Sequence, residues 1–275
     1  MFSALQSLRA RGAGGDPLPT VWEALKERDI YFRRGHLHLI SAAPGVGKSA
    51  FVLNYVIKSG TPTLYFSADS DAFTQLSRIV SMLTGTGLDQ AAELVRSGET
   101  ESYREALTGL PSRFIFEASP DLEDIKQSLK SYEELYGEYP ELIVIDNITD
   151  VRTGNLDNDA NPTEGMEFLC SELHSLARTY QTAVIGLHHV TGPHNSGDKP
   201  VSLSGLKGQI GRVPEMVLTL HKVDAGNGDF HYLRASAVKN RGGKSDSSGE
   251  TFAELEFEGA KMNITDVRSH FSFGV

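Results

Sequence analysis

The segment AAPGVGKS at residues 42–49 constrains the fold more than any other part of this sequence. It follows an apolar, β-type run, LHLIS, and precedes a stretch that predicts a helix from about Lys48 to Lys58. A Gly-rich turn in this position fits the phosphate-binding pattern GxxxxGK[ST], except that Ala42 stands in the place of the first Gly. The segment therefore predicts a nucleotide site on a strand–loop–helix unit.

The residue types of this loop suit a phosphate. Small residues allow the backbone N–H groups of Gly45, Val46 and Gly47 to surround it, with the positive end of the following helix directed at it. Lys48 supplies a charge to the outer phosphates, and the Ser49 hydroxyl is a ligand for Mg²⁺. The predicted nucleotide-binding residues are Ala43, Pro44, Gly45, Val46, Gly47, Lys48, Ser49 and Ala50.

Short apolar runs alternate with amphipathic stretches along residues 37–189. Helices are expected near Ala72–Met82, after Leu122, and from about Thr163 to Tyr180. Apolar strands separated by helices are typical of a mostly parallel sheet that is buried on both faces. Beyond residue 214 four strand-like runs follow one another, which predicts antiparallel hairpins. The expected fold class is α/β, with a mostly parallel central sheet, flanking helices and C-terminal antiparallel hairpins.

Length and composition predict one principal domain. The chain has 275 residues, a formal net charge of -10 and one cysteine, Cys170, and it shows no apolar run near the ~20 residues that span a bilayer. Residues 11–19 resemble a linker, and Thr20 is the expected N-cap of a short helix over 21–29. We expect an extension over 1–29 and the domain over 30–275, in an intracellular, cytoplasmic protein without a membrane partner.

Two acids are placed for nucleotide chemistry. LIVID at residues 142–146 is an apolar strand that ends in Asp146, where a carboxylate can hold Mg²⁺ directly or through water. The strand TLYFSA leads into Asp69, whose carboxylate is expected at the same sheet edge to orient or deprotonate water. Asp71 is the competing acid, and a helix N-cap is the ordinary role for either of these two acids.

The strand TAVIGLHH ends in His188 and His189, whose side chains should point to opposite faces. A polar residue at this strand end is well placed to contact the γ-phosphate of a nucleotide. Two polar loops, 152–162 and 191–200, follow predicted core strands on the edge where open α/β sheets bind ligands. Each is either a functional loop or a surface connection.

A basic run at residues 231–245 contains Arg234, Lys239, Arg241 and Lys244 and no acid. One interpretation is a solvated hairpin tip. The other is that the sequence KNR supplies cations to the γ-phosphate bound by a neighbouring subunit, as an arginine finger does in trans.

With these residues in hand, the chain resembles the RecA-fold P-loop ATPases, and among them the ATPase domain of DnaB-type hexameric replicative helicases and their compact RepA-like plasmid and phage relatives. The resemblance covers about residues 30–265. It rests on the Ala-initiated phosphate loop, on FSADS at 66–70, on LIVIDNI, on IGLHH, and on KPVSLSGLKGQIGRVPEMVLTLHK at 199–222.

The resemblance implies ATP hydrolysis with Mg²⁺, coupled to movement on single-stranded DNA by a ring, expected to be a homohexamer. It implies that Asp69 is the catalytic acid, with aspartate in place of the family's glutamate, and that His189 stands where DnaB-type proteins have a glutamine sensor. Lys239 and Arg241 match the lysine and arginine that reach across the subunit interface. The residues expected to contact DNA are His194, Lys199, Lys207 and Arg212.

Two other functions fit the same sequence. A RecA- or RadA-like recombination ATPase would carry the same motifs and assemble as a filament on DNA. A nucleotide-gated binding or regulatory module with little turnover would be consistent with aspartate at position 69.

Overall fold

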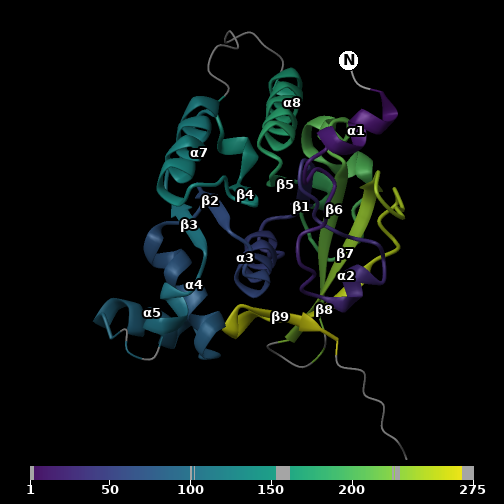
Figure 1. The fold of residues 1–275 in the computed structure, drawn as a ribbon. Helices are drawn as coiled ribbons and strands as arrows, with labels where there is room; N and C mark the ends of the chain where they lie inside the picture. The colour runs from purple at the N-terminus through teal and green to yellow at the C-terminus, as the bar shows by residue number, and fades with distance from the viewer. Residues whose placement is uncertain are drawn as a thin grey trace, which may run out of the picture.

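The computed structural model describes residues 3–99, 101, 103–152, 162–224, 226 and 230–267. Within them the strands form one nine-stranded sheet in the order β3-β2-β4-β5-β1-β6-β7-β8-β9 (Figure 1). The strands are β1 (Leu37–Ala42), β2 (Thr63–Ser67), β3 (Ser112–Ile115), β4 (Leu142–Asp146), β5 (Ala183–His189), β6 (Met216–Asp224), β7 (Phe230–Asn240), β8 (Ala253–Glu258) and β9 (Asn263–Asp266).

The sheet has a parallel part and an antiparallel part. The six strands from β3 to β6 in this order are parallel to their neighbours, whereas β7, β8 and β9 pair antiparallel. The predicted fold class, a mostly parallel α/β sheet with C-terminal antiparallel hairpins, is therefore confirmed.

Helices connect and cover the strands. The α-helices are α1 (Ala4–Ala10), α2 (Glu23–Lys26), α3 (Lys48–Ser59), α4 (Ala72–Thr84), α5 (Leu88–Ser97), α6 (Arg104–Thr108), α7 (Leu122–Tyr136) and α8 (Pro162–Tyr180). Short 3₁₀ helices are η1 (Ile148–Asp150), η2 (Gly192–His194), η3 (Leu203–Gly205), η4 (Lys207–Arg212) and η5 (Gly259–Lys261). Helices α1, α5 and α6 were not predicted, and no helix of the described residues is long and apolar enough to cross a membrane.

Both faces of the central strands are buried. Successive residues of a strand point to opposite faces, and in β1 Ile40 packs into a cluster with Trp22 and Phe51, whereas Leu39 packs into a second cluster with Leu173. The first cluster joins α2 and α3 to the sheet, and the second joins α7 and α8 to it. Burial on both faces explains why the core strands read as continuous apolar runs.

The segment before β1 is part of this core. The Trp22 ring stacks on Phe51 of α3 with 4.8 Å between ring centroids, and Leu18 and Leu25 are buried in the same cluster. Helix α2 begins at Glu23, with Trp22 at the N-cap position, so the predicted cap at Thr20 is wrong. The division at residue 29 stays a prediction, but residues 18–29 contribute to the core of the main domain.

The strand directions define two edges that the site depends on. At the carboxyl edge, β1, β2, β4 and β5 end at Ala42, Ser67, Asp146 and His189. At the amino edge the same strands begin, and β7 ends there, because Asn240 pairs with Met216 and Met216 pairs with His38.

His38 gives the domain a predictable response to acid. It is buried, its Nε2 accepts the Arg33 N–H at 3.2 Å and its Nδ1 donates to the Val184 carbonyl at 3.2 Å, so the neutral ring has a partner on each side. Burial foremost lowers its pKa from 6.5 to about 3. Between these two values the unfolded chain binds a proton that the folded chain does not, and acid therefore favours unfolding.

We expect His38 alone to lower the free energy of unfolding by roughly 1.4 kcal/mol for each pH unit below about 6.5. Chemical denaturation between about pH 7 and about pH 5 measures this slope. His38→Gln should make the slope shallower, because glutamine does not titrate there. Equal slopes in the wild type and the variant would contradict this account of His38.

Candidate nucleotide site

The phosphate loop joins β1 to α3 at the carboxyl edge. Gly45 and Gly47 have φ of 75° and 117°, in the left-handed region where a side chain is strained. Gly47 is the N-cap of α3, so the free N–H groups of this helix begin at the loop. The Lys48 side chain is buried and its Nζ donates to the Ala42 carbonyl oxygen at 3.1 Å. This backbone can accept a phosphate at the helix N-terminus.

Lys48 lies within electrostatic reach of both predicted acids. Burial lowers the pKa of its ammonium, while Asp146 and then Asp69 act in the opposite direction. The structure thus brings Lys48, Asp69 and Asp146 together at the carboxyl edge, although they lie on three different segments.

Asp146 ends β4 in a setting that suits a cation. Its Oδ2 accepts the Tyr65 hydroxyl at 2.9 Å, while its buried Oδ1 has no hydrogen-bond partner among the described residues. Burial foremost raises the pKa of this carboxyl, opposed by the hydroxyls of Ser49 and Tyr65. A buried carboxylate oxygen beside a serine hydroxyl and a phosphate loop is the ligand chemistry that Mg²⁺ requires, so the donor set fits the predicted metal.

The two competing acids after β2 have different environments. Asp71 caps α4, since its carboxylate accepts the Thr74 N–H at 2.8 Å. Asp69 is exposed, and its Oδ2 accepts the Asn147 Nδ2 at 2.6 Å. The Asp69 N–H also donates to the Asp146 carbonyl at 3.4 Å. Of the two, Asp69 is therefore the acid that lies next to the predicted metal ligand.

The paired histidines differ as expected for neighbours on a strand. His188 is buried and its Nε2 donates to the Lys207 carbonyl at 2.7 Å, and burial foremost lowers its pKa to about 4. His189 is half-buried and its Cα pairs with that of Ala42 at the start of the phosphate loop. Burial and then Lys48 lower the pKa of His189, while Asp69 opposes them. His189 is thus the histidine on the nucleotide side.

Lys239 and Arg241 lie at the amino edge, away from the phosphate loop of their own chain. The Arg241 N–H donates to the Glu215 carbonyl. The N–H of Glu215 in turn donates to the carbonyl of Leu37, the first residue of β1. From Leu37 to Ala42 the strand extends about 17 Å at ~3.3 Å per residue. Lys239 donates to the Gly211 and Arg212 carbonyls at 2.7 Å each, and burial foremost lowers its pKa to about 8.

The predicted DNA-contacting residues are not gathered at one place. His194 and Lys199 belong to the loop after β5. Lys207 follows that loop, and its carbonyl accepts the hydrogen bond from His188. Arg212 lies instead at the amino edge, where its carbonyl accepts from Lys239 and Arg241. Residues 192–194 of the loop form η2, which was not predicted. Of the other predicted loop, 152–162, residues 153–161 lie outside the described residues.

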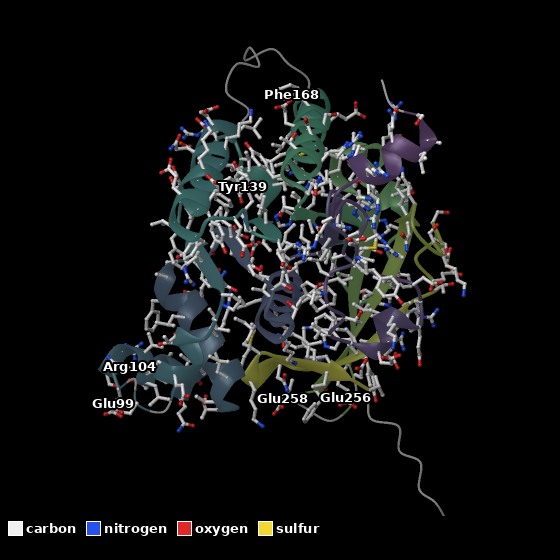
Figure 2. The ribbon with its side chains drawn as sticks, viewed as in Figure 1. Glu99, Arg104, Tyr139, Phe168, Glu256 and Glu258 are labelled. Atoms are coloured by element: carbon white, nitrogen blue, oxygen red, sulfur yellow. The ribbon has the colours of Figure 1, made fainter. Side chains whose placement is uncertain are left out.

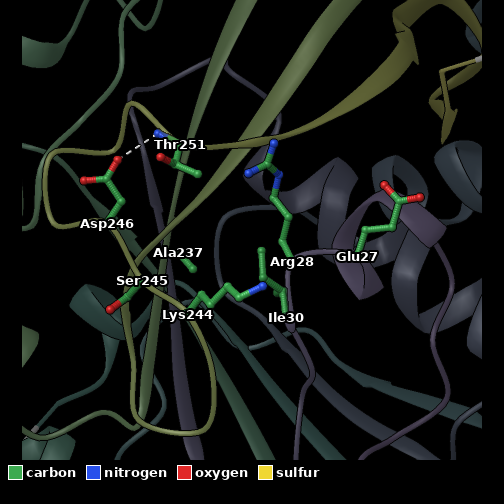
Figure 3. Close-up of a pocket in the computed structure, with 8 residues that line it drawn as sticks. All are labelled: Glu27, Arg28, Ile30, Ala237, Lys244, Ser245, Asp246 and Thr251. Carbon is green, nitrogen blue, oxygen red and sulfur yellow. Dashed lines mark hydrogen bonds between the residues drawn. The ribbon is translucent and has the colours of Figure 1, made fainter.

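A pocket of about 180 Å³ lies beside the turn that follows β7 (Figure 3). Arg28 reaches it from the carboxyl end of α2, and Lys244 and Asp246 from the loop after β7. Beside the pocket, a hydrogen bond joins the end of β7 to the segment after α2: Asn240 Nδ2 donates to the Asp29 carbonyl at 3.1 Å. No residue of the phosphate loop lines this pocket, so it is separate from the candidate nucleotide site.

Three residues of the two edges were missed by sequence reasoning. Tyr65 and Asn147 hold the carboxylates of Asp146 and Asp69, and Glu215 contacts Arg241 with 3.8 Å between Oε1 and Nη1. Asn147 directly follows Asp146, which was a usable signal. For Tyr65 and Glu215 the sequence carried none, because their contacts depend on strand register.

The comparisons with known proteins agree with this geometry. The model of a family described as "AAA domain" matches residues 4–193, more than half of the chain. The chain belongs to this AAA domain family.

Two phage proteins are similar over nearly their whole lengths. The Gene 65 protein of Mycobacterium phage L5 is 55% identical over 267 residues, which cover 97% of this chain and 99% of the phage protein. The Gene 65 protein of Mycobacterium phage D29 is 56% identical over 229 residues, covering 83% of this chain and 98% of that protein. A "Probable plasmid replicative DNA helicase" of Chlamydia psittaci is 27% identical over 220 residues. That match covers 76% of this chain and 47% of the Chlamydia protein, so this AAA domain chain corresponds to about half of it.

Solved structures share the fold. A DnaB-like replicative helicase, described together with its interactions with primase, has a TM-score of 0.74 at 14% identity, covering 96% of this chain and 65% of that one. A second solved structure, described as an ATPase domain, has a TM-score of 0.73 at 14% identity, covering 96% of both chains. The AAA domain chain therefore has the RecA-type fold of DnaB-like ATPase domains, and the predicted resemblance is confirmed.

The Tyr65 contact predicts a specific effect on metal dependence. Tyr65→Phe keeps the buried ring but removes the hydroxyl that orients Asp146. We expect the Mg²⁺ concentration that half-saturates nucleotide binding to rise roughly 2- to 10-fold, because one buried hydrogen bond contributes ~0.5–1.5 kcal/mol. Titration of a fluorescent nucleotide at varied Mg²⁺ measures the shift.

The matched control is Tyr55→Phe. The Tyr55 hydroxyl donates to the Pro19 carbonyl at 2.9 Å, away from the nucleotide site, so this variant should keep the wild-type Mg²⁺ dependence. Equal Mg²⁺ dependence in both variants would contradict the role assigned to Tyr65.

Proposed function

We propose that this chain is the subunit of an oligomeric, Mg²⁺-dependent ATPase motor of the DnaB type that acts on single-stranded DNA. One observation carries the proposal: the phosphate loop and the Lys239–Arg241 pair lie at opposite edges of the sheet. If each of these two edges carries half of a phosphoryl-transfer site, one subunit cannot complete a site alone. A complete site then needs a second copy of the chain. Head-to-tail contacts of this kind generate rings or helical filaments.

Each group at the carboxyl edge has a role in this proposal. The N–H groups of Gly45 and Gly47 and the Lys48 ammonium bind the phosphates. Asp69, oriented by Asn147, accepts a proton from the attacking water or aligns it. His189, next to Lys48 and Ala42, contacts the γ-phosphate. Ser49 and Asp146 would hold Mg²⁺, which would neutralise part of the negative charge of the nucleotide phosphates.

The partner's cations complete the site in this proposal. An arginine supplied across an interface stabilises the charge of the transition state and contributes about 10³–10⁵ in rate in enzymes that use one. Arg241 is half exposed and Lys239 lies beside it, so both can meet a neighbour's nucleotide.

Single-stranded DNA is the proposed track. His194 and Lys199 lie in the loop directly after the strand that carries His189, so contact with a γ-phosphate can shift that loop. The Chlamydia relative and the DnaB-like structure are both described as replicative helicases, which supports this choice. The net charge of -10 is compatible with DNA, because a central channel needs cations only on its inner loops.

The first test joins turnover to assembly. We expect ATP hydrolysis to be stimulated by single-stranded DNA, and the mass in the presence of ATP and Mg²⁺ to be that of a closed oligomer. A monomer that DNA does not stimulate would overturn the motor proposal. A filament whose length follows that of the DNA would favour a recombination ATPase instead.

The second test concerns the acid that acts on water. Asp69→Asn should lower kcat by about 10²–10⁴ while nucleotide affinity stays within a few-fold of wild type. Asp71→Asn is the control, because asparagine is also a good N-cap and should leave turnover unchanged. If Asp69→Asn turns over normally, the base lies elsewhere.

The third test asks whether the cations act in trans. Lys48→Ala and Arg241→Ala subunits should each be inactive alone. In an equal mixture about one quarter of the interfaces join an intact phosphate loop to an intact Arg241, and we expect ATPase activity to reappear at those interfaces. No recovery in mixtures shown to contain both subunits would contradict a site shared between subunits.

A further inference from the structure

Glu215 joins three elements at the amino edge. It lies directly before β6 and is buried, with 9% of its surface exposed. Its Oε2 accepts the Leu37 N–H at 3.0 Å, and its Oε1 lies 2.9 Å from His174 Nε2 of α8. A buried carboxylate is costly unless its oxygens have polar partners, and here the Leu37 N–H of β1 and the His174 imidazole of α8 contact one oxygen each.

The same residue also controls where Arg241 lies. The Glu215 carbonyl accepts the Arg241 N–H at 2.9 Å, and its Oε1 is 3.8 Å from Arg241 Nη1. Nη2 of Arg241 donates to the Arg212 carbonyl at 3.0 Å. Glu215 therefore contacts both the backbone and the guanidinium of Arg241.

The guanidinium of Arg241 is held in place while most of its N–H donors stay free among the described residues. The 3.8 Å contact lies within ion-pair distance but beyond hydrogen-bond distance, and only the Arg212 carbonyl takes one of the five guanidinium donors within the described part of the chain. A phosphate can therefore bind this guanidinium without first displacing a strong bidentate partner.

A groove of about 650 Å³ lies at this point of the surface. From α8 the groove is lined by Glu167, Phe168, Ser171 and His174, and its other lining residues are Arg212, Val213 and Arg241. Figure 2 shows Phe168 near the amino-terminal end of α8, and its side chain is 44% exposed. Arg241 thus lines the same groove as His174, and both residues contact Glu215.

We infer that Glu215 is a positioning residue for the arginine finger: it fixes the direction in which Arg241 is presented to the nucleotide of the neighbouring subunit. The inference rests on the proposed function, since it concerns the finger of that site. Glu215 contacts no nucleotide of its own chain, because about 17 Å of β1 separates it from the phosphate loop. Its effect should therefore appear only in the site to which its subunit donates Arg241.

This direction of action can be measured by mixing subunits. In the reference mixture, Lys48→Ala subunits donate Arg241 to Arg241→Ala subunits, which hydrolyse ATP. In the donor arm Glu215→Gln is added to the Lys48→Ala subunit. In the acceptor arm the same substitution is added to the Arg241→Ala subunit. Glutamine keeps the shape of Glu215 and removes its charge.

We expect the donor arm to fall about 10-fold or more below the reference mixture in kcat, because small misplacements of a catalytic group cost up to 10²-fold. KM for ATP should not change, since the phosphate loop is untouched. The acceptor arm should match the reference, which also shows that Glu215→Gln subunits fold and hydrolyse ATP.

Two results would overturn the inference. If both arms match the reference, Glu215 does not position Arg241. If both arms fall equally, Glu215 supports the fold of the whole subunit and has no directional role. A reference mixture without any recovered activity would instead count against the proposed function, so the two failures are distinguishable.

Discussion

Strand β1 is the element on which the arrangement of the molecule depends. Its carboxyl end runs into the phosphate loop, and its amino end is bonded to Glu215, which holds Arg241. Because β1 is rigid, central and buried on both faces, the distance between the two ends cannot shrink by local motion. In the proposed assembly the cationic pair is thereby kept from the nucleotide of its own chain and is available to that of a neighbour.

The antiparallel hairpin makes this separation possible. Strands β1 and β6 are parallel, so the strand direction first reverses at the β6–β7 connection, and β7 returns its cations to the amino edge. A further parallel strand in place of β7 would have delivered Lys239 and Arg241 to the carboxyl edge. In the proposed assembly the same hairpin would link the two sites of one subunit through β6 and Glu215.

Much of the fold was predictable because local signals agreed with one another. The Gly-rich loop, the apolar runs and the alternation of strands and helices all indicated the same sheet, and Lys48, Asp69, Asp146 and His189 were placed at its carboxyl edge from strand ends alone. Helices α5 and α6 were not predicted. Ala91 of α5 and Tyr103, directly before α6, form a small buried cluster with Val80 of α4, separate from the two main clusters.

The missed contacts share a physical cause. Tyr65 reaches Asp146 because β2 and β4 are neighbours in the sheet, with Ser67 paired to Asp146, although the sequence has β3 between them. Glu215 meets Leu37 and His174 only when β1, β6 and α8 are assembled. Contacts between segments so distant in sequence depend on strand order and register, which local patterns do not contain.

The most direct measurement is a structure of the assembled protein with single-stranded DNA, Mg²⁺ and a non-hydrolysable ATP analogue. We predict an oligomer in which the guanidinium of Arg241 lies about 3 Å from the γ-phosphate held by the next subunit's phosphate loop. An assembly in which Arg241 faces solvent, or contacts the nucleotide of its own chain, would contradict it.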